Sequence, residues 1–216
     1  MKLLILGATG RTGNLIFKKA LDDGHEVVAI VRDPEKLQGT RAEILQGTPY
    51  DREAVDKAMP GCDAVICALN VSRTSDNPWS KLRAPKDLIS KSIQHTIDAM
   101  EAHDVKRLIS LSVLGIGDTK RKMPFLFSLF ISMTYVKYAF IDHERQEKRM
   151  QQSSVDWTAV RLPLLTDKEG EHEVLVNKQD DFKLKGSINR ESVARFVLSI
   201  LNEPEYFERI VAISNA

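Results

Sequence analysis

The sequence predicts an α/β fold, in which helices cover both faces of a doubly wound parallel sheet, and three observations carry that prediction. Short apolar runs alternate with amphipathic stretches along almost the whole chain. Residues 3–6 are continuously apolar, which is typical of a strand covered on both faces. That run leads directly into a turn containing Gly7, Gly10 and Gly13, after which a helical pattern begins.

Capping residues bound the elements expected in the first half of the chain. The first helix is expected over residues 12–23, followed by Gly24 at the position where glycine commonly ends a helix. Asp33 is expected to cap a short helix that begins with Pro34. Asp51 is expected to cap the next helix. The strands expected in this half are Lys2–Leu6, Glu26–Val31, Glu43–Gln46 and residues 63–69.

The second half continues the alternation. Apolar residues at helical spacing predict a helix over residues 85–103, and an apolar and then charged helical stretch follows over residues 124–152. Asn189 is expected to cap the last helix. The strands expected here are Arg107–Val113, residues 157–161 and residues 209–213, with one or two short strands near residues 173–176 and 182–185.

Length, charge and cysteine content restrict the classes of protein to which this chain can belong. The 216 residues fit one domain over residues 1–216, and the net charge of +1 offers no basic field for nucleic acid. Cys62 and Cys67 lack metal-ligand companions, so we expect free thiols and no metal site. The chain opens with strand and turn rather than with a signal peptide, which predicts a cytoplasmic location.

The glycine turn is the strongest functional signal. A strand, a turn with glycine at every third position and a helix place backbone N–H groups where a pyrophosphate binds. A tight turn without a ligand is the alternative. The pattern predicts a single-domain Rossmann fold with a small C-terminal extension on the substrate side, which we expect to be formed by about residues 114–140 and 163–188.

The residues after the second strand predict the choice of dinucleotide. NAD sites commonly place a carboxylate there, whereas the 2′-phosphate of NADP requires a cation. Asp33 is assigned to helix capping, and Arg32 has no competing role. Arg11 is expected to add a second cation in the same region, so NADP(H) is preferred over NAD(H).

These segments resemble the atypical short-chain dehydrogenases/reductases. The closest likeness is to the NAD(P)H-binding proteins that include biliverdin-IXβ/flavin reductase, with the NmrA-like proteins as cousins. The likeness rests on the turn Gly7-Ala8-Thr9-Gly10-Arg11-Thr12-Gly13, and on Arg32-Asp33, Gly61-Cys62-Asp63-Ala64-Val65-Ile66, Asp142-His143, Trp157-Thr158-Ala159-Val160-Arg161-Leu162-Pro163 and Ile188-Asn189-Arg190-Glu191-Ser192-Val193-Ala194. It covers nearly the whole chain.

The resemblance implies a role for each matching position. Gly7, Thr9, Gly10, Arg11, Thr12 and Gly13 would hold the pyrophosphate, and Arg32 would bind the adenosine phosphate. Ala68, Leu69 and Asn70 would pass beside the riboses, and Leu111, Ser112 and Pro163 would lie near the nicotinamide.

At two positions the sequence departs from the family pattern, which weakens the roles that the resemblance implies there. The family commonly has Gly-Asp after the third strand, where this chain has Gly47-Thr48, which weakens the contact to adenine. The biliverdin reductase branch often has His after the proline of the sixth strand, where this chain has Leu164, so a tetrapyrrole substrate is in doubt.

The Ser, Tyr and Lys triad of ordinary short-chain dehydrogenases is absent. Tyr135 is followed four residues later by Ala139, and Tyr138 by Asp142, so neither tyrosine has its lysine. Hydride transfer to a conjugated acceptor does not require a protein acid, because solvent can protonate the delocalised product. The candidate catalytic residues are Ser112, as a hydrogen-bond donor or only a cofactor contact, and His143, as a group titrating near neutrality or only a structural histidine.

One apolar stretch has several interpretations. Residues 123–136 carry no charge and fall short of the roughly 20 residues that cross a bilayer, so no transmembrane span is expected. A buried helix, a wall of the substrate site or a subunit contact is expected. Peripheral membrane attachment is the alternative, because the basic run Lys120-Arg121-Lys122, otherwise a solvated loop, is adjacent.

The sequence therefore predicts an NADPH-dependent oxidoreductase that transfers a hydride to a small conjugated acceptor, such as a flavin, a quinone or a related carbonyl compound. The alternative is an NmrA-like regulatory protein that senses NADP without turnover. The chain is expected to be a monomer or a homodimer.

Overall fold

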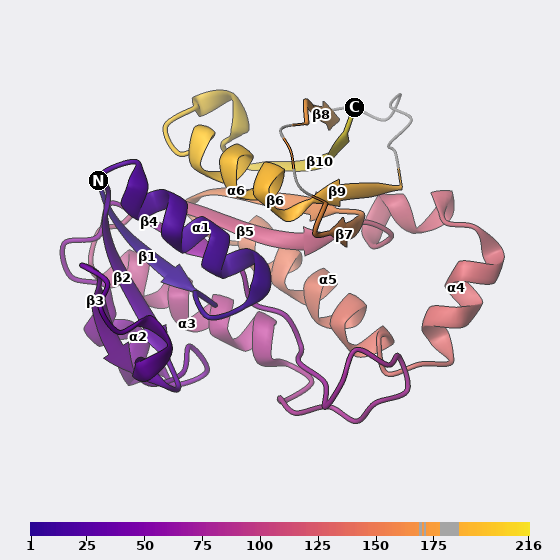
Figure 1. The fold of residues 1–216 in the computed structure, drawn as a ribbon, viewed down its shortest axis with the longest axis horizontal. Helices are drawn as coiled ribbons and strands as arrows, with labels where there is room; N and C mark the ends of the chain where they lie inside the picture. The colour runs from indigo at the N-terminus through magenta and orange to yellow at the C-terminus, as the bar shows by residue number, and fades with distance from the viewer. Residues whose placement is uncertain (169, 171, 178–185) are drawn as a thin grey trace.

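An eight-stranded sheet forms the centre of the computed structural model, which describes residues 1–168, 170, 172–177 and 186–216 (Figure 1). Its strands are β1 Lys2–Leu6, β2 Glu26–Val31, β3 Glu43–Gln46, β4 Ala64–Cys67, β5 Arg107–Val113, β6 Asp156–Leu162, β8 Val174–Asn177 and β10 Arg209–Asn215. The order across the sheet is β3-β2-β1-β4-β5-β6-β10-β8, and every pair is parallel except β10 with β8. The first six strands follow the Rossmann order, so the predicted α/β architecture is confirmed.

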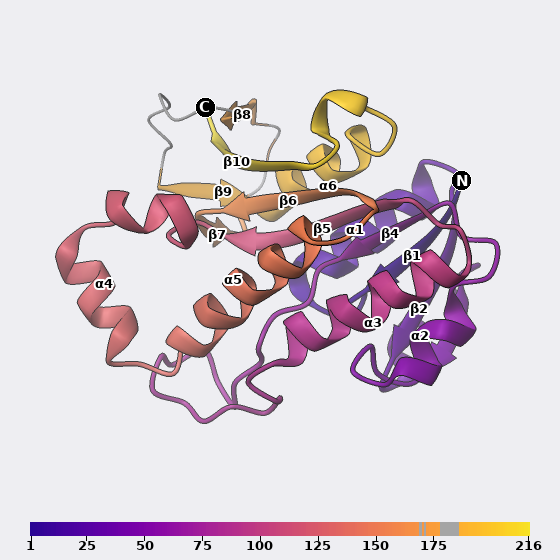
Figure 2. The same cartoon turned by 180° about the vertical axis from the view of Figure 1, so that it is seen from behind.

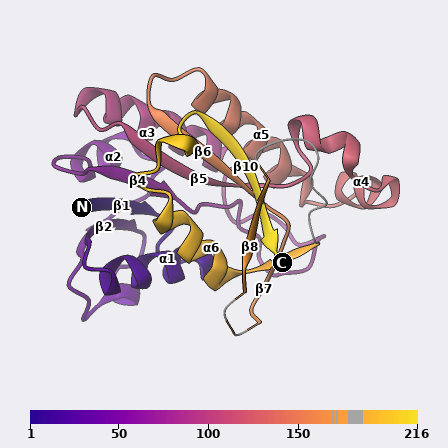
Figure 3. The same ribbon diagram turned by 90° about the horizontal axis from the view of Figure 1, so that it is seen from above.

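Helices cover both faces of the sheet, as Figure 3 shows. On one face lie α1 (Arg11–Asp22) and α6 (Arg190–Ser199); on the other lie α2 (Arg52–Ala58), α3 (Leu88–Ala102) and α5 (Lys137–Gln151). Three short 3-10 helices complete the connections: η1 Pro34–Leu37, η2 Gly117–Lys122 and η3 Pro204–Tyr206.

The side chains of β1 divide between the two cores, as strand alternation requires. Leu3 and Ile5 pack in the core that includes Phe17 of α1, whereas Leu4 and Leu6 pack in the core on the opposite face. All four leucine and isoleucine side chains of β1 are fully buried, which explains the continuous apolar run in the sequence.

Two buried polar side chains satisfy helix ends from neighbouring elements. Asp142 of α5 accepts hydrogen bonds from the backbone N–H groups of Ile89 (2.7 Å) and Ser90 (3.3 Å), at the start of α3. Arg107 of β5 donates to the carbonyl oxygens of Ile200 and Leu201, both at 2.9 Å, where α6 ends. Free helix termini are costly when buried, so these contacts fix α3 against α5 and α6 against the sheet.

The apolar stretch and the charged helix expected over residues 124–152 are two separate helices. Helix α4 (Phe125–Ser132) and α5 meet at an angle of 100°. The interpretation of residues 123–136 as a buried helix is wrong, because only Ile131 of α4 is buried and Phe125 and Leu126 are 78% and 77% exposed. Figures 1 and 2 show α4 at the outer end of the molecule, beyond α5.

Among the described residues, no single helix is long and apolar enough to cross a membrane. The bent pair of α4 and α5, taken together, has the required length and composition.

The C-terminal extension contains a second, two-stranded sheet. Strands β7 (Leu164–Thr166) and β9 (Ser187–Asn189) pair in parallel just beyond the end of β6. Asn189 caps α6 as predicted, because its Oδ1 accepts from the Ser192 N–H. The strand expected near residues 173–176 is β8, and the one expected over residues 182–185 lies outside the described residues.

Candidate dinucleotide-binding and active site

The residues expected to bind a dinucleotide lie along the carboxyl edge of the sheet. In the strand register, Leu6 of β1 pairs with Ile30 of β2 and Cys67 of β4, and Cys67 pairs with Ser110 of β5. The next residues along these strands therefore emerge side by side, and Ser112 pairs with Arg161 of β6. Ligands of open α/β sheets bind at this edge, at the point where the strands that follow β1 are added first on one side of it and then on the other.

The glycine turn packs so closely that side chains are excluded. Gly7 has a φ of +89°, and a Cβ on it would lie 2.8 Å from the Ala68 carbonyl oxygen. A Cβ on Gly13 would lie only 2.1 Å from the Gly7 carbonyl oxygen, and one on Gly10 would lie 3.2 Å from the same atom. Glycine at these positions therefore lets the main chain turn tightly from β1 into α1 and pack against the end of β4; the turn formed by residues 7–13 is here called the cradle.

Helix α1 begins inside this cradle without a side-chain cap. Gly10 is the N-cap residue, and no side chain of the described structure bonds to the N–H groups that follow it. The N–H of Gly10 itself bonds to the Gly7 carbonyl oxygen at 2.9 Å. Thr9, Gly10 and Arg11 are exposed and Thr12 is half-buried, so the first-turn N–H groups and the positive end of the helix can receive an anion.

The structure corrects two steps in the argument for NADP. Asp33 does not cap η1 with its side chain; its carboxylate lies 3.8 Å from Lys36 Nζ instead. Arg11 lies 3.2 Å from Asp76, in the loop after β4, whereas Arg32 follows β2 on the other side of β1. Arg11 therefore does not add a second cation beside Arg32. Arg32 and Asp33 are both exposed at the end of β2, where either can face a ribose.

The remaining expected contacts differ in accessibility. Ala68, Leu69 and Pro163 are half-buried at strand ends, and Asn70 is exposed, with its Oδ1 accepting from the Val71 N–H at 2.8 Å. Leu111 is buried in the core shared with α1 and α6, so its side chain faces away from the sheet edge.

Ser112 belongs to a buried polar network between β5, β6 and α5. Its Oγ donates to Glu147 Oε1 at 2.7 Å, and the same carboxylate accepts from Arg161 Nε (3.0 Å) and Nη2 (2.8 Å). Arg161 Nη1 bonds to Asp118 at 2.5 Å. Burial works to lower the pKa of Arg161, but its bonds to Glu147 and Asp118 outweigh burial and raise it. Because the one hydroxyl proton of Ser112 is engaged, Ser112 is left as an acceptor rather than the expected donor.

His143 is a buried, neutral side chain. It is 3% exposed, and burial lowers its pKa from 6.5 to about 4. Its Nδ1 accepts from Gln146 Nε2 at 2.9 Å, an atom that also donates to the Leu111 carbonyl oxygen. The expectation that His143 titrates near neutrality is therefore wrong, because the folded protein excludes the water that would stabilise the charged ring.

Glu147 is the residue that sequence reasoning missed. His143 and Glu147 stand four residues apart on α5 and both face β5, which is the spacing of the missing Tyr and Lys. That spacing, together with Arg161 between the apolar residues Val160 and Leu162, was the available signal. An arginine in such a place needs a carboxylate partner.

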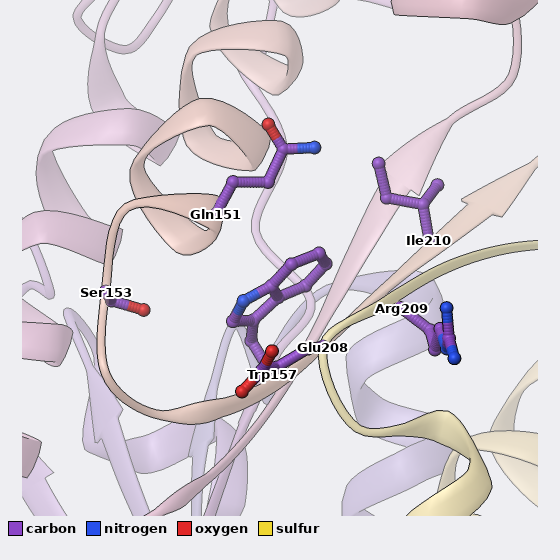
Figure 4. Close-up of a pocket in the computed structure, with 6 residues that line it drawn as sticks. All are labelled: Gln151, Ser153, Trp157, Glu208, Arg209 and Ile210. Atoms are coloured by element: carbon purple, nitrogen blue, oxygen red, sulfur yellow. The ribbon is translucent and has the colours of Figure 1, made fainter.

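Two hollows lie away from this edge. One, of about 420 Å³, is lined by Gln151, Ser153, Trp157, Glu208, Arg209 and Ile210 (Figure 4). It lies where β6 and β10 begin, at the edge opposite the glycine turn. The other is lined by Asp87, Ser90, Lys91, Gln94, His95, Arg145 and Arg149, from α3 and α5. No cluster of three or more metal-binding side chains occurs in the part of the chain that the structure describes.

Comparisons with known proteins agree with this geometry. The profile of a family described as NAD(P)H-binding matches residues 7–204. An uncharacterized protein of Bacillus subtilis, YwnB, is 28% identical over 230 residues, covering 100% of both chains. A (4-alkanoyl-5-oxo-2,5-dihydrofuran-3-yl)methyl phosphate reductase of Streptomyces griseus is 27% identical over 161 residues, covering 74% of this chain and 46% of the relative.

Among solved structures, ChuY, described as an anaerobillin reductase from Escherichia coli O157:H7, superposes with a TM-score of 0.82. The identity is 18%, with 100% of this chain and 97% of that chain covered. At that identity the likeness shows the fold.

Proposed function

This chain belongs to the NAD(P)H-binding family, and from that premise we propose that it is an NADPH-dependent oxidoreductase of the atypical short-chain dehydrogenase/reductase type. Its acceptor is a small conjugated molecule: a flavin, a quinone or a related carbonyl compound. The observation that carries the proposal is the uncapped start of α1 in this cradle, where exposed residues leave the first-turn N–H groups open to an anion.

The residues of this cradle fit the diphosphate of a dinucleotide. The first-turn N–H groups of α1 have no capping side chain and donate to phosphate oxygens. The absence of a Cβ at Gly7 and Gly13 lets β1, the start of α1 and the end of β4 pack closely at this edge of the sheet. Thr9, Gly10, Arg11 and Thr12 border this position.

The preference for NADPH rests on Arg32. Its exposed guanidinium can bind a 2′-phosphate through charge-assisted hydrogen bonds, whereas a carboxylate would repel that phosphate. Asp33 is the competing group, because its side chain is not used as a helix cap. Ala68, Leu69, Asn70, Pro163 and the backbone of Leu111 complete the proposed cofactor contacts along the sheet edge.

At the nicotinamide end, the side chains hold the reacting molecules in position and do not donate a proton to the acceptor. NADPH supplies the hydride when bound. Ser112, whose proton is directed at Glu147, accepts a hydrogen bond from a carboxamide or ribose group. His143, neutral and buried, supports the backbone of Leu111 through Gln146 and does not exchange a proton near pH 7. The reduced acceptor takes its proton from solvent, which suits a conjugated acceptor.

Residues 114–140 and 163–188 are proposed to form the substrate side of this single domain. They follow β5 and β6 at the carboxyl edge. We also propose a cytoplasmic location and a monomer or homodimer.

Stopped-flow mixing with NADPH and a panel of FMN, FAD and quinones tests the activity. Loss of NADPH absorbance with at least one acceptor is expected, and NADH should be slower. Binding of NADPH without oxidation by any acceptor would overturn the reductase proposal.

A regulatory protein that senses NADP without turnover is the second candidate. The observation that favours it is that neither Tyr135 nor Tyr138 has a lysine partner and that the Ser112 proton is already engaged. A pull-down in which NADP releases a bound protein partner would support this reading, and steady consumption of NADPH would count against it.

A further inference from the structure

Helix α4 carries apolar side chains at every position except Ser128 and Ser132, which stand four residues apart, and most of these apolar side chains are exposed. A helix this rich in apolar residues is normally buried in a core or a membrane. Its exposed large side chains, together with Trp79 (58% exposed), are here called the α4 surface: Trp79, Phe125, Leu126, Phe127, Leu129, Phe130 and Met133. Contiguous exposed apolar patches of this kind mark interaction sites.

The loop after β4 is attached to this surface. The Trp79 ring meets the Phe130 ring edge-on, with centroids 5.8 Å apart, and Phe127 stacks on Phe130 at 6.4 Å. The Tyr135 N–H bonds to the Pro78 carbonyl oxygen at 3.0 Å. Tryptophan and tyrosine beside an apolar helix are the side chains that favour the boundary between lipid headgroups and acyl chains.

Basic residues flank α4 on both sides in the sequence. Although the whole chain carries a net charge of only +1, residues 119–141 contain no acidic residue. Asp118, just before them, is bonded to Arg161. The exposed Asp76 of the adjoining loop is paired with Arg11. The basic residues within residues 119–141 are Lys120, Arg121, Lys122 and Lys137.

This charge distinguishes between the candidate occupants. Two copies of the chain that met symmetrically through α4 would bring like charges together, which is unfavourable. An anionic bilayer is complementary to the flanking cations and receives the apolar side chains. Eight residues of helix span roughly 12 Å, which suits a helix lying in the headgroup region and not one crossing the bilayer.

We propose that the α4 surface docks the protein reversibly on an anionic membrane, with α4 and Trp79 in the headgroup region and Lys120, Arg121 and Lys137 on lipid phosphates. The docking is a property of the surface and does not depend on catalytic turnover.

Co-sedimentation with vesicles of phosphatidylcholine alone, or mixed with phosphatidylglycerol, tests the proposal. We expect binding to the mixed vesicles only, weakened by added salt. The emission of Trp79 should shift to the blue on binding, and since Trp157 is only 6% exposed, Trp79→Phe should bind but lose the shift.

Matched variants distinguish binding through the α4 surface from nonspecific binding to vesicles. Leu126→Ser should weaken binding by about tenfold, whereas Leu164→Ser, which removes a leucine of similar exposure (71%) from β7, should not. The pair Lys120→Gln with Arg121→Gln should cost about tenfold or more, and the pair Lys18→Gln with Lys57→Gln, which removes the same charge elsewhere, much less.

Three outcomes would overturn the proposal. They are no binding to either vesicle, equal binding to neutral and anionic vesicles, and equal losses in the α4 and control variants. A dimer in sedimentation equilibrium that Leu126→Ser dissociates, without vesicle binding, would assign the surface to a second copy instead.

Discussion

The hydroxyl of Ser112 donates to the carboxylate of Glu147 at 2.7 Å, across 35 residues of sequence. Glu147 at the same time bonds twice to Arg161, which is 3% exposed. One carboxylate thus holds the serine at the end of β5 and neutralises the arginine in β6. The geometry of the proposed nicotinamide end therefore depends on a residue of α5.

Glu147→Gln should destabilise the fold by about 3 kcal/mol, because it leaves the buried Arg161 with one carboxylate partner instead of two. Urea unfolding measures this loss. Glu144→Gln is the control, since Glu144 pairs with the exposed Lys148, at 3.4 Å, and its replacement should change stability by less than about 0.5 kcal/mol. Similar losses in the two variants would contradict the role of Glu147.

Gly13→Ala should damage the turn far more than Gly10→Ala. The new Cβ at Gly13 would sit 2.1 Å from the Gly7 carbonyl oxygen, a backbone atom that cannot move cheaply, whereas the one at Gly10 would sit at 3.2 Å. We expect a loss of about 2–3 kcal/mol for Gly13→Ala and about 1 kcal/mol for Gly10→Ala. Thermal unfolding and NADPH titration would both register the difference, and equal effects would refute the close packing.

Arg32→Ala should weaken NADPH binding by about 1.5–3 kcal/mol, the scale of a charged hydrogen bond, and NADH binding much less. Fluorescence titration with both cofactors measures the two affinities. Arg52→Ala, which removes an exposed arginine at the start of α2, is the control. If Arg32→Ala weakens both cofactors equally, Arg32 does not bind the 2′-phosphate, and Asp33 becomes the candidate ribose contact.

His143 should make the fold sensitive to mild acid. Its folded pKa of about 4 lies below the ordinary 6.5, so between these values the unfolded chain binds a proton that the folded chain does not. Its contribution is complete above pH 6.5 and is lost as the pH falls toward 4, in total about 3 kcal/mol. His143→Gln should flatten the fall in unfolding free energy between pH 7 and 5. His172→Gln, at an exposed histidine, should leave it unchanged.

Much of the fold could be predicted because local patterns and tertiary structure agree. β1, β2, β3 and β5 have the predicted bounds. In β1 and β2 the reason is that buried parallel strands are largely apolar and end at turn residues. The break between α4 and α5 could not be predicted, because residues 133–136 contain no glycine or proline. It coincides with a contact from far along the chain, the bond from the Tyr135 N–H to Pro78.

The site was predictable where a backbone motif defines it and not where side chains meet across elements. Glycine spacing identified the turn at Gly7 and Gly13. The pairing of Glu147 with Ser112 and Arg161 depends on how α5 lies on the sheet, which sequence spacing alone does not give. The burial that makes His143 neutral depends on the same packing.

The antiparallel strand β8 affects the tendency of the protein to aggregate through the edge of its sheet. It pairs with residues 212–215 of β10, so this part of the seven-residue strand is not open to a neighbouring molecule. The described sheet ends in two strands of four residues, β3 and β8, and short margins of this kind offer little template for intermolecular strand addition. The reversal at the C-terminus thus helps to keep the protein from aggregating at high concentration.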